Sequence, residues 1–324
     1  MTLAQLRYAV AVDAHRHFGR AAEACFVSQP TLSAGLKRLE DELGAALFDR
    51  SRQPVVPTAH GARVLRQARA VLREADGLAA LAGGDGGEPV GELRLGVIPT
   101  LASCLLPLVA GPFARRHPGA VLSLHETTTE AILDGLDAGR LDAGLIATDE
   151  RRAGIASRRL YDEPFVAYVG AGHPLADAPA VACDTLSLDE VWLLAEGHCF
   201  RDQVVSLCGA PGAGGPLGGR VQFESGSLET LRRMVDRAGG LTLLPHMTTL
   251  YLSDDELARV RPLAAPVPRR EVRLAYGRAH SKRPLVEACA EAVIHVVAGL
   301  RESAGFEGEV GPDGPALRRA AGRG

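Results

Sequence analysis

Several features are missing from this sequence, and each absence excludes a class of protein. No apolar run reaches the roughly 18 residues that a membrane span requires, because charge or proline interrupts every such stretch. Residues 1–26 contain several charges and no cleavage site of small residues, so they do not form a secretory signal. The sequence also lacks the Cys and His spacing of a metal site and a glycine loop for phosphate. We therefore expect a cytoplasmic protein with no metal and no cofactor.

The chain has only six cysteines in 324 residues, and the expected compartment is too reducing for them to form a structural disulfide framework. Any disulfide in this chain should therefore be transient. The six cysteines are Cys25, Cys104, Cys183, Cys199, Cys208 and Cys289. All except Cys199 and Cys208 have apolar flanking residues that suit positions in a core.

The net charge of -3 conceals an asymmetry along the chain. Residues 1–75 contain eleven Lys and Arg against seven acidic residues, so they carry a net charge of +4 and the remainder carries -7. A polyanion such as DNA should therefore prefer the N-terminal segment.

Three short helices are predicted at the start of the chain, because apolar residues recur at helical spacing. Ser28 followed by Pro30 predicts the start of the third helix, and Gly44 predicts its end. Residues 50–58 are typical of a short hairpin or wing, and a long amphipathic helix is expected over 59–81. The three short helices are expected at residues 3–15, 19–24 and 30–43.

The rest of the chain alternates apolar strands with helices, which predicts a parallel α/β sheet. A glycine-rich hinge at 83–91 precedes it, and a tail from Ser303, rich in Gly, Pro and charge, should be disordered. Strands are expected at residues 92–98, 121–126, 142–147, 164–170, 191–197, 220–224, 241–245 and 271–277. Helices are expected near residues 101–116, 129–139, 227–238 and 282–300.

Residues 19–38 contain the small residues, the turn and the second helix that a helix-turn-helix requires. The run FGRAAEACFVSQPTLSAGLKRLEDELGAALFDRS, followed by PTAHG, resembles the winged-helix segment of the LysR family of transcriptional regulators. The resemblance implies binding to double-stranded promoter DNA. The residues implied at the DNA are Ser28, Gln29, Pro30, Thr31, Ser33 and Lys37, with Arg50 and Arg52 of the wing on phosphates.

Two observations leave the details of DNA reading open. The same polar residues suit a solvated helical packing domain. Ala34 and Gly35 also stand where longer polar side chains are frequent in the family, so the bases that are read stay undetermined.

The resemblance also implies an architecture and an assembly. The long helix has an apolar face that one winged domain cannot cover, so in this family it pairs with its copy, which implies a homo-oligomer, a dimer of dimers. The implied units are a winged helix-turn-helix at 1–58, a linker and dimerisation helix at 59–82, the hinge at 83–91, an α/β regulatory domain at 92–302 and the tail at 303–324. The regulatory domain is similar to periplasmic binding proteins, with subdomain I at about 92–161 and 270–302 and subdomain II at about 162–269.

The segment LAEGHCFRDQVVSLC, residues 194–208, concentrates reactive groups. Cys199 follows Gly197 and a predicted strand, begins a predicted helix, and has His198 and Arg201 beside it in sequence. Nearby cations and a helix N-terminus favour the thiolate, which is the form that reacts with peroxide. The alternatives are a buried apolar role for Cys199 and an ordinary surface position for His198.

Cys208 follows Cys199 by nine residues, which sets the distance between the two thiols. If this segment is helical, the α-carbons are about 13 Å apart, whereas a disulfide tolerates only about 7 Å. Joining the two sulfur atoms would therefore refold the segment and act as a switch. The predicted steps are a sulfenic acid at Cys199, condensation with Cys208, and reduction by glutaredoxin or thioredoxin.

The motif EGHC-x-RDQ with the second cysteine is similar to the OxyR-type peroxide sensors of the LysR family. GVIPT, HETTTE and SLETLRRMV extend this similarity to about residue 300. The resemblance implies that Thr100 and Thr129 hold peroxide, with helix capping as the alternative. It also places His198 and Arg270 near the sulfur, with Arg269 as the fallback.

This chain also departs from that subfamily. Its loop at 209–219 is glycine-rich, and Gly277 replaces an arginine, which leaves the contact with RNA polymerase undetermined.

Three classes of function are compatible with these residues. The first is a regulator that responds to hydrogen peroxide and recruits RNA polymerase. The second is a LysR regulator that binds a small organic effector between its regulatory subdomains. The third is a cysteine enzyme such as a thiol peroxidase, but no residue pattern marks a turnover cycle, so we expect no enzyme. The reactive segment 194–208 favours the first.

Overall fold

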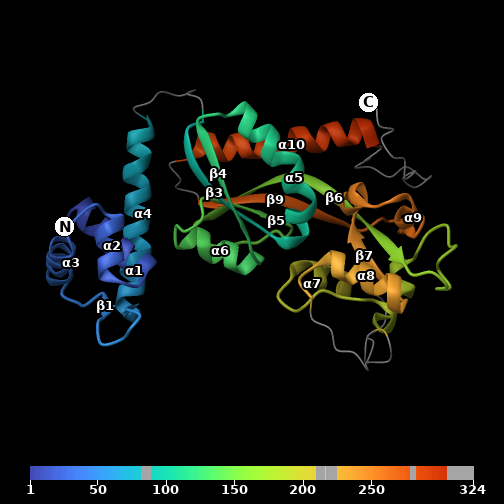
Figure 1. Ribbon diagram of the computed structural model, residues 1–324, viewed down its shortest axis with the longest axis horizontal. Coiled ribbons are helices and arrows are strands. Elements are labelled where there is room, and N and C mark those ends of the chain that lie inside the picture. The colour runs from blue at the N-terminus through green and yellow to red at the C-terminus, as the bar shows by residue number, and fades with distance from the viewer. Residues whose placement is uncertain (82–88, 209–215, 217–224, 278–281, 305–324) are drawn as a thin grey trace.

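The computed structural model describes residues 1–81, 89–208, 216, 225–277 and 282–304 (Figure 1). A winged helix-turn-helix forms the N-terminal unit, and a long helix leads from it to a larger α/β unit. The N-terminal elements are α1 (Leu3–His15), α2 (Phe18–Ala24), α3 (Gln29–Leu43), β1 (Phe48–Asp49), β2 (Val56–Pro57) and α4 (Ala59–Leu81). The predicted helices are confirmed, and the wing is confirmed with its first strand slightly before the predicted range.

Local capping explains where the helices of this unit begin and end. The Ser28 side chain accepts a hydrogen bond from the Thr31 N–H at 3.3 Å, and Pro30 occupies the first turn of α3. Gly44 ends α3 in a left-handed conformation with φ 69°, which glycine adopts without strain. Thr58 begins α4 by accepting the Gly61 N–H at 2.9 Å.

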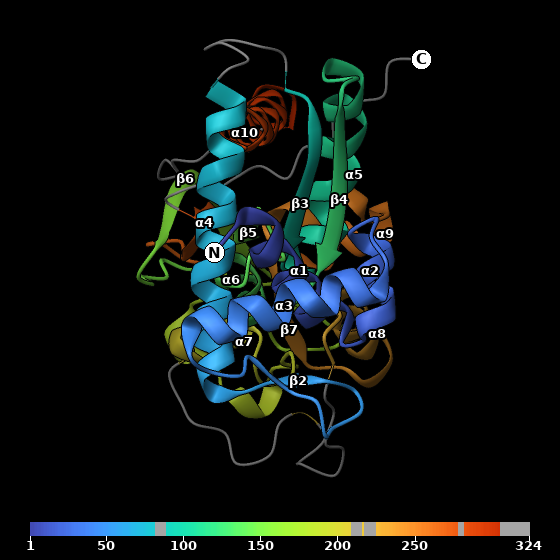
Figure 2. The ribbon, with the colours of Figure 1, turned by 90° about the vertical axis from the view of Figure 1, so that its left-hand side faces the viewer.

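The winged unit buries part of the apolar face of α4. Leu65, Ala68 and Leu72 pack into the same core as α1 and α3, so this part of the face is covered within one chain. The expectation that one winged domain leaves the face uncovered is wrong for these three residues, whereas Val71 is 36% exposed. Figure 2 shows this unit facing the viewer, with α3 on its outer side.

The larger unit contains a seven-stranded sheet in the order β4-β3-β5-β9-β6-β7, with β8 pairing to β6. Its strands are β3 (Gly91–Val97), β4 (Ala120–Glu126), β5 (Ala143–Ile146), β6 (Ile155–Val169), β7 (Leu241–Pro245), β8 (Val260–Pro262) and β9 (Arg269–Gly277). Its helices are α5 (Pro99–Arg116), α6 (Thr129–Asp137), α7 (Cys199–Leu207), α8 (Leu228–Ala238), α9 (Asp254–Leu257) and α10 (Arg283–Ala304), with short turns η1 (Cys183–Thr185), η2 (Leu188–Glu190) and η3 (His246–Tyr251). Within the described ranges, no helix combines the length and the hydrophobicity of a bilayer crossing.

The prediction of a parallel sheet is correct for only part of this unit. β3 is parallel to β4 and to β5, whereas β9 is antiparallel to both β5 and β6. β6 is also antiparallel to β7 and β8. The sheet is therefore mixed, because the last strand returns from the C-terminal part of the chain and inserts between β5 and β6.

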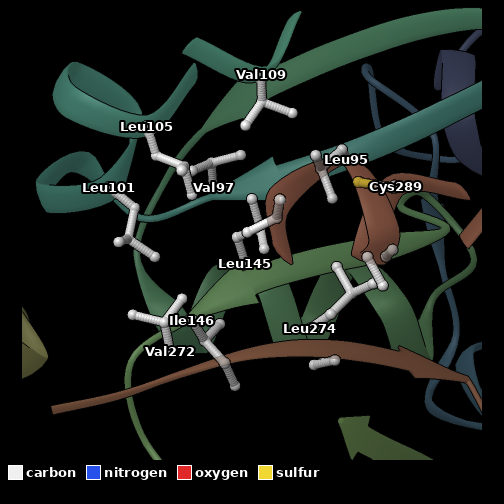
Figure 3. Close-up of a cluster of buried hydrophobic side chains, with 14 of the residues drawn as sticks. Leu95, Val97, Leu101, Leu105, Val109, Leu145, Ile146, Val272, Leu274 and Cys289 are labelled. Atoms are coloured by element: carbon white, nitrogen blue, oxygen red, sulfur yellow. The ribbon is translucent and has the colours of Figure 1, made fainter. Parts of the chain in front are cut away.

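Two hydrophobic cores lie along this sheet, and β6 contributes to both. The first core contains Ile155 and Tyr161 from the first part of β6, together with residues of β3, β5, α5, α6 and α10. Figure 3 shows part of it, including Leu95 and Leu274. The second core contains the later residues of β6, such as Tyr168, with residues of β7, α7 and α8. β6 leads from the first half of the α/β unit to the second, and β9, paired antiparallel to it, leads back.

Some strand predictions fail. Residues 191–197 do not form a strand, because only Val191 bridges to Leu241 while the rest of the segment runs through the second core as irregular chain. The first part of β6 was not predicted, since its charged residues hide the strand pattern. The strand at 220–224, most of the hinge and most of the tail lie outside the described residues. Helix α10 extends through Ala304, past the predicted start of the tail.

We expect Gly61→Ala to destabilise the winged unit by about 1–3 kcal/mol, the usual cost of overpacking. A Cβ at Gly61 would lie 1.9 Å from the Leu47 carbonyl oxygen, which is backbone and cannot turn aside. Gly299→Ala in α10 is the matched control, because no atom lies within 4 Å of its added Cβ and alanine favours the helix. Urea unfolding should show a lower midpoint for the first variant only; equal midpoints would contradict this prediction.

Candidate redox site and DNA-binding face

Cys199 is the first residue of α7, and the preceding backbone turns sharply to present it. Gly197 adopts φ 86°, and His198 follows as the N-cap residue without a capping hydrogen bond from its side chain. The Phe200 N–H lies close enough to the Cys199 sulfur to lower the pKa of the thiol. The sequence prediction that Cys199 starts a helix is therefore confirmed.

A small pocket lies against this thiol, at a point where three helices begin. Thr100 is the second residue of α5, Thr129 is the first residue of α6, and Cys199 is the first of α7. Helix N-termini favour negative charge, so the arrangement suits a thiolate or a polar oxygen ligand. The volume of this pocket is only about 10 Å³, roughly the space for one water molecule. Its lining consists of Ile98, Pro99, Thr100, Thr128, Thr129, Gly197, His198, Cys199 and Phe200.

A fully buried arginine reaches the rim of this pocket. The Arg270 guanidinium donates to the Thr100 hydroxyl at 2.7 Å and to the Thr100 carbonyl at 3.2 Å. It also donates to one carboxylate oxygen of Glu163 at 2.9 and 2.7 Å. The other Glu163 oxygen accepts the Met247 N–H at 2.9 Å. The arginine is therefore held by a buried network and brings positive charge towards Cys199.

The pKa of Cys199 is set by opposing effects, of which burial is the largest. Burial raises the pKa, while the Thr129 hydroxyl and the Arg270 charge lower it and Asp202 raises it. The net pKa is raised, so the thiol is the main form at neutral pH. The Thr129 oxygen is buried, and its polar neighbour in the described part of the chain is the Cys199 sulfur.

The residues adjacent to Cys199 in sequence are placed differently from one another. His198 lines the pocket, and its ring also packs beside Gly226. Arg201 instead donates to the Leu194 carbonyl at 3.0 Å, which ties α7 to the segment that precedes it. Arg270 is the cation with the largest effect on the pKa of Cys199. Arg269, the fallback residue, begins β9 beside it.

The second cysteine lies at the far end of α7. Cys208 is the C-cap residue, half-buried against the second core, and its N–H donates to the Val204 carbonyl. The intervening helix is confirmed, so the two α-carbons are about 13 Å apart at ~1.5 Å per residue. Phe200 anchors α7 in the second core edge-on to Phe165, with ring centroids 5.3 Å apart. The Gln203 amide donates to the Ala147 carbonyl at 2.8 Å, beside the first core.

The face predicted to bind DNA is formed by α3 and the wing. Most predicted residues are exposed there, and Ser33 is half-buried. Arg50 pairs with Glu40 at 2.6 Å, and Arg52 lies 3.4 Å from Asp49. The exposed predicted residues are Ser28, Gln29, Pro30, Thr31, Lys37, Arg50 and Arg52.

A groove of about 550 Å³ separates α3 from the start of α1. The ring of Tyr8 lies over Gly35, where an added Cβ would be 2.8 Å from a ring carbon. Tyr8 therefore occupies the space that a side chain at position 35 would fill. Tyr8 and Arg38 both line the groove and were not predicted at this face. A glycine at position 35 in the middle of α3 was the available signal that another side chain packs closely there.

Sequence reasoning also missed Glu163, the partner of Arg270. Glu163 directly precedes the apolar end of β6, and an acidic residue beside such a run is an available signal for a buried partner. No group of three or more metal-ligating side chains occurs in the described ranges.

Comparison with known proteins identifies the class. The model described as "Bacterial regulatory helix-turn-helix protein, lysR family" matches residues 3–62, and the "LysR substrate binding domain" matches residues 86–298. The chain belongs to the LysR family of transcriptional regulators.

Relatives within this family are peroxide-responsive regulators by name. The chain is 36% identical to the "Hydrogen peroxide-inducible genes activator" of Pectobacterium carotovorum subsp. carotovorum, over 94% of this chain and 99% of the relative. It is 36% identical to the "DNA-binding transcriptional dual regulator OxyR" of Escherichia coli K12, over 90% and 95% of the two chains. A full-length OxyR variant from Pseudomonas aeruginosa superimposes with a TM-score of 0.78 at 35% identity, over 91% of this chain and 98% of that one.

We expect Arg270→Met to destabilise the protein by about 3–5 kcal/mol, because it leaves the Glu163 carboxylate buried without its partner. Adding Glu163→Gln should recover part of this loss, since no buried charge then remains. Arg273→Met, on the same strand but less buried, is the control. Chemical unfolding of these four proteins and of Glu163→Gln alone measures the effect; an additive double variant would show that the pair does not act as a unit.

Proposed function

We propose that this chain is a transcription regulator that senses hydrogen peroxide through oxidation of Cys199. The observation that carries the proposal is the small pocket at the junction of α5, α6 and α7, where hydroxyl groups and a cysteine meet. The similarity to peroxide-inducible activators supports the same class of signal. A solved OxyR variant from Corynebacterium glutamicum with bound hydrogen peroxide, at 28% identity and a TM-score of 0.61, also supports it.

The size of the pocket favours peroxide over an organic effector. Pockets for organic ligands are typically ~300–1,000 Å³, whereas the space beside Cys199 admits about one water-sized molecule. Larger cavities among the described residues lie elsewhere: between α8 and α9, between α1 and α3, and beside α10. They do not contain Cys199.

The proposed chemistry begins with the thiolate form of Cys199. The sulfur attacks one peroxide oxygen, the O–O bond breaks, and the other oxygen leaves as hydroxide, which is protonated to water. Thr100 and Thr129 hold the two oxygens, and the Arg270 charge stabilises the developing negative charge. The sulfur is oxidised by two electrons to a sulfenic acid. Cys208 then attacks this sulfur as a thiolate, a second hydroxide leaves, and the disulfide forms.

Formation of that disulfide requires α7 to unwind, because about 13 Å must shrink to about 7 Å or less. Unwinding removes Phe200 from the second core and breaks the hydrogen bond between Gln203 and Ala147. Contacts of α7 with both halves of the regulatory unit therefore change together. We propose that this rearrangement alters a homo-oligomer, a dimer of dimers, on promoter DNA and its contact with RNA polymerase. Glutaredoxin or thioredoxin would reduce the disulfide and reset the switch.

A direct test is peptide mapping after brief treatment with peroxide. The wild-type chain should give a Cys199–Cys208 cross-linked peptide and an altered DNA footprint. Cys199→Ser and Cys208→Ser should give neither, and Cys25→Ser should behave as the wild type. Two unmodified thiols in the treated wild-type protein would reject the proposal. An unchanged footprint despite the cross-link would show that oxidation is not transmitted to the DNA.

The raised pKa of Cys199 predicts a steep pH dependence. Below the pKa, the thiolate fraction grows about tenfold for each pH unit, and the thiolate is the nucleophile. The rate constant for sulfenic acid formation should therefore rise about tenfold per unit between pH 6 and pH 8. Stopped-flow measurement on Cys208→Ser isolates this step. A rate that is already constant above pH 6 would mean that the thiol is ionised at neutral pH.

A further inference from the structure

The groove between α1 and α3 borders the face predicted to bind DNA. Its volume is about 550 Å³, and Pro30 and Thr31, two of the predicted DNA-binding residues, line it together with residues of α1. Helix α3, which forms one wall, lies on the outer side of the winged unit (Figure 2). Among the described residues, the lining contains one cation, Arg38, and no acid. The groove therefore continues the predicted DNA face and carries positive charge.

The polar groups in this groove fall into two sets. Thr2 and Gln5 cap α1: the Thr2 hydroxyl accepts the Gln5 N–H at 3.2 Å, and the Gln5 amide oxygen accepts the Thr2 N–H at 2.7 Å. The Thr31 hydroxyl lies 2.8 Å from the side chain that caps α3. Within the part of the chain that the structure describes, the Tyr8 hydroxyl and the Arg38 guanidinium make no hydrogen bond or ion pair. These two groups are the ones available to a partner.

The charge of Arg38 is left unpaired although an acid stands at helical spacing from it. Glu42 follows Arg38 by four residues, a spacing at which helices form ion pairs. The Glu42 carboxylate pairs instead with the N-terminal ammonium group of Met1. Arg38 itself is exposed, so its guanidinium is open to an anion from outside the chain.

The position of Tyr8 is fixed by the backbone of α3. Two carbons of its ring would lie 2.8 and 2.9 Å from a Cβ added at Gly35, so the ring packs directly on the glycine. Gly35 precedes Arg38 by three residues, which puts both on one side of α3. The Tyr8 ring therefore lies one helical turn from the position of Arg38, and both residues line the same groove.

We propose that Tyr8 and Arg38 bind the phosphate backbone of one DNA strand along this groove while α3 occupies the major groove. This inference rests on the DNA binding of the proposed regulator and is independent of its peroxide chemistry. The guanidinium and the phenolic O–H are donors, and phosphate oxygens are charged acceptors. Contacts to phosphate position a protein on DNA without reading its sequence. The two residues thus set the orientation of α3 at a stretch where Ala34 and Gly35 have no polar side chain to contribute.

The first experiment measures the DNA affinity of the full-length reduced protein as a function of salt concentration. One probe is a duplex that the wild-type protein selects from a random-sequence pool, and the other contains the same bases in scrambled order. Arg38→Gln should weaken binding to both duplexes by a similar factor. The slope of log affinity against log salt should become shallower by about 0.9, the value for one neutralised phosphate.

Tyr8→Phe tests the hydroxyl by itself, because the ring can stay over Gly35 and the fold is preserved. The variant should bind both duplexes about tenfold more weakly, since a hydrogen bond to a charged group is lost. Its salt slope should equal that of the wild type, because no charge is removed. Arg116→Gln, which alters an exposed arginine at the end of α5 in the regulatory unit, is the charge-matched control and should bind as the wild type.

The outcomes separate this inference from the proposed function. Wild-type affinity and salt slope in both variants would overturn the inference and leave DNA binding intact. Weaker binding to the selected duplex alone would also overturn it, because the residue would then contact a base. An effect of one variant only would overturn the role of the other residue. A wild-type protein that enriches no duplex from the pool would instead overturn the DNA-binding function, and this inference with it.

A second experiment locates the contact on the DNA. Single phosphates of the selected duplex are replaced in turn by uncharged methylphosphonates. At the phosphate that Arg38 binds, the replacement should weaken the wild-type protein but have little further effect on Arg38→Gln, because the same contact cannot be lost twice. Tyr8→Phe should show this behaviour on the same strand. If every replacement weakens the wild type and both variants by equal factors, neither side chain contacts the backbone and the proposal is wrong.

Discussion

The buried ion pair between Arg270 and Glu163 is the interaction on which the redox site depends. The two residues lie opposite each other on the antiparallel strands β9 and β6, and neither side chain is exposed. A buried charge of this kind is tolerated only when its hydrogen-bonding groups are paired, and here the pairing extends beyond the strands. Thr100 at the start of α5 and Met247 in η3 complete it. The pair therefore fixes both the position of a pocket hydroxyl and the positive charge near Cys199.

In the proposed mechanism, helix α7 converts this fixed site into a switch because the helix is stable only through its contacts with the rest of the protein. A nine-residue helix is too short to persist in water by itself, so contacts with the rest of the protein must stabilise it. Phe200 and Val204 supply apolar contacts in the second core, and Gln203 supplies a hydrogen bond beside the first. A covalent bond between the ends of this helix is strong enough to replace these contacts. The same elements explain why the thiols stay apart before oxidation.

The sequence was most informative where the local signals were strong. Ser28, Pro30 and Gly44 fixed the bounds of the recognition helix, because capping depends on neighbouring residues only. The start of a helix at Cys199 was also predicted, although the His198 side chain makes no capping hydrogen bond there. The mixed sheet was not, since whether β9 runs parallel or antiparallel to its neighbours depends on a strand far away in sequence.

Electrostatic partners were harder to predict than helices. Arg201 follows Cys199 closely in sequence, but its guanidinium reaches the Leu194 carbonyl. Arg270 is distant in sequence and yet has the stronger effect on the thiol. Sequence proximity does not give the direction of a side chain, and no local pattern paired Arg270 with Glu163. The sign of the pKa shift was equally inaccessible, because it follows from how deeply Cys199 is buried.

Strand β6 couples the stability of the two hydrophobic cores. Its 15 residues supply side chains to two cores, so neither core can melt without disturbing strand pairing in the other. Unwinding of α7 breaks none of these pairings. In the proposed mechanism, the helix that unwinds is therefore one short element, and the strands that carry both cores stay paired. In the proposed mechanism the cycle can therefore be repeated, because the segment that rearranges is separate from the strands that give the protein its thermodynamic stability.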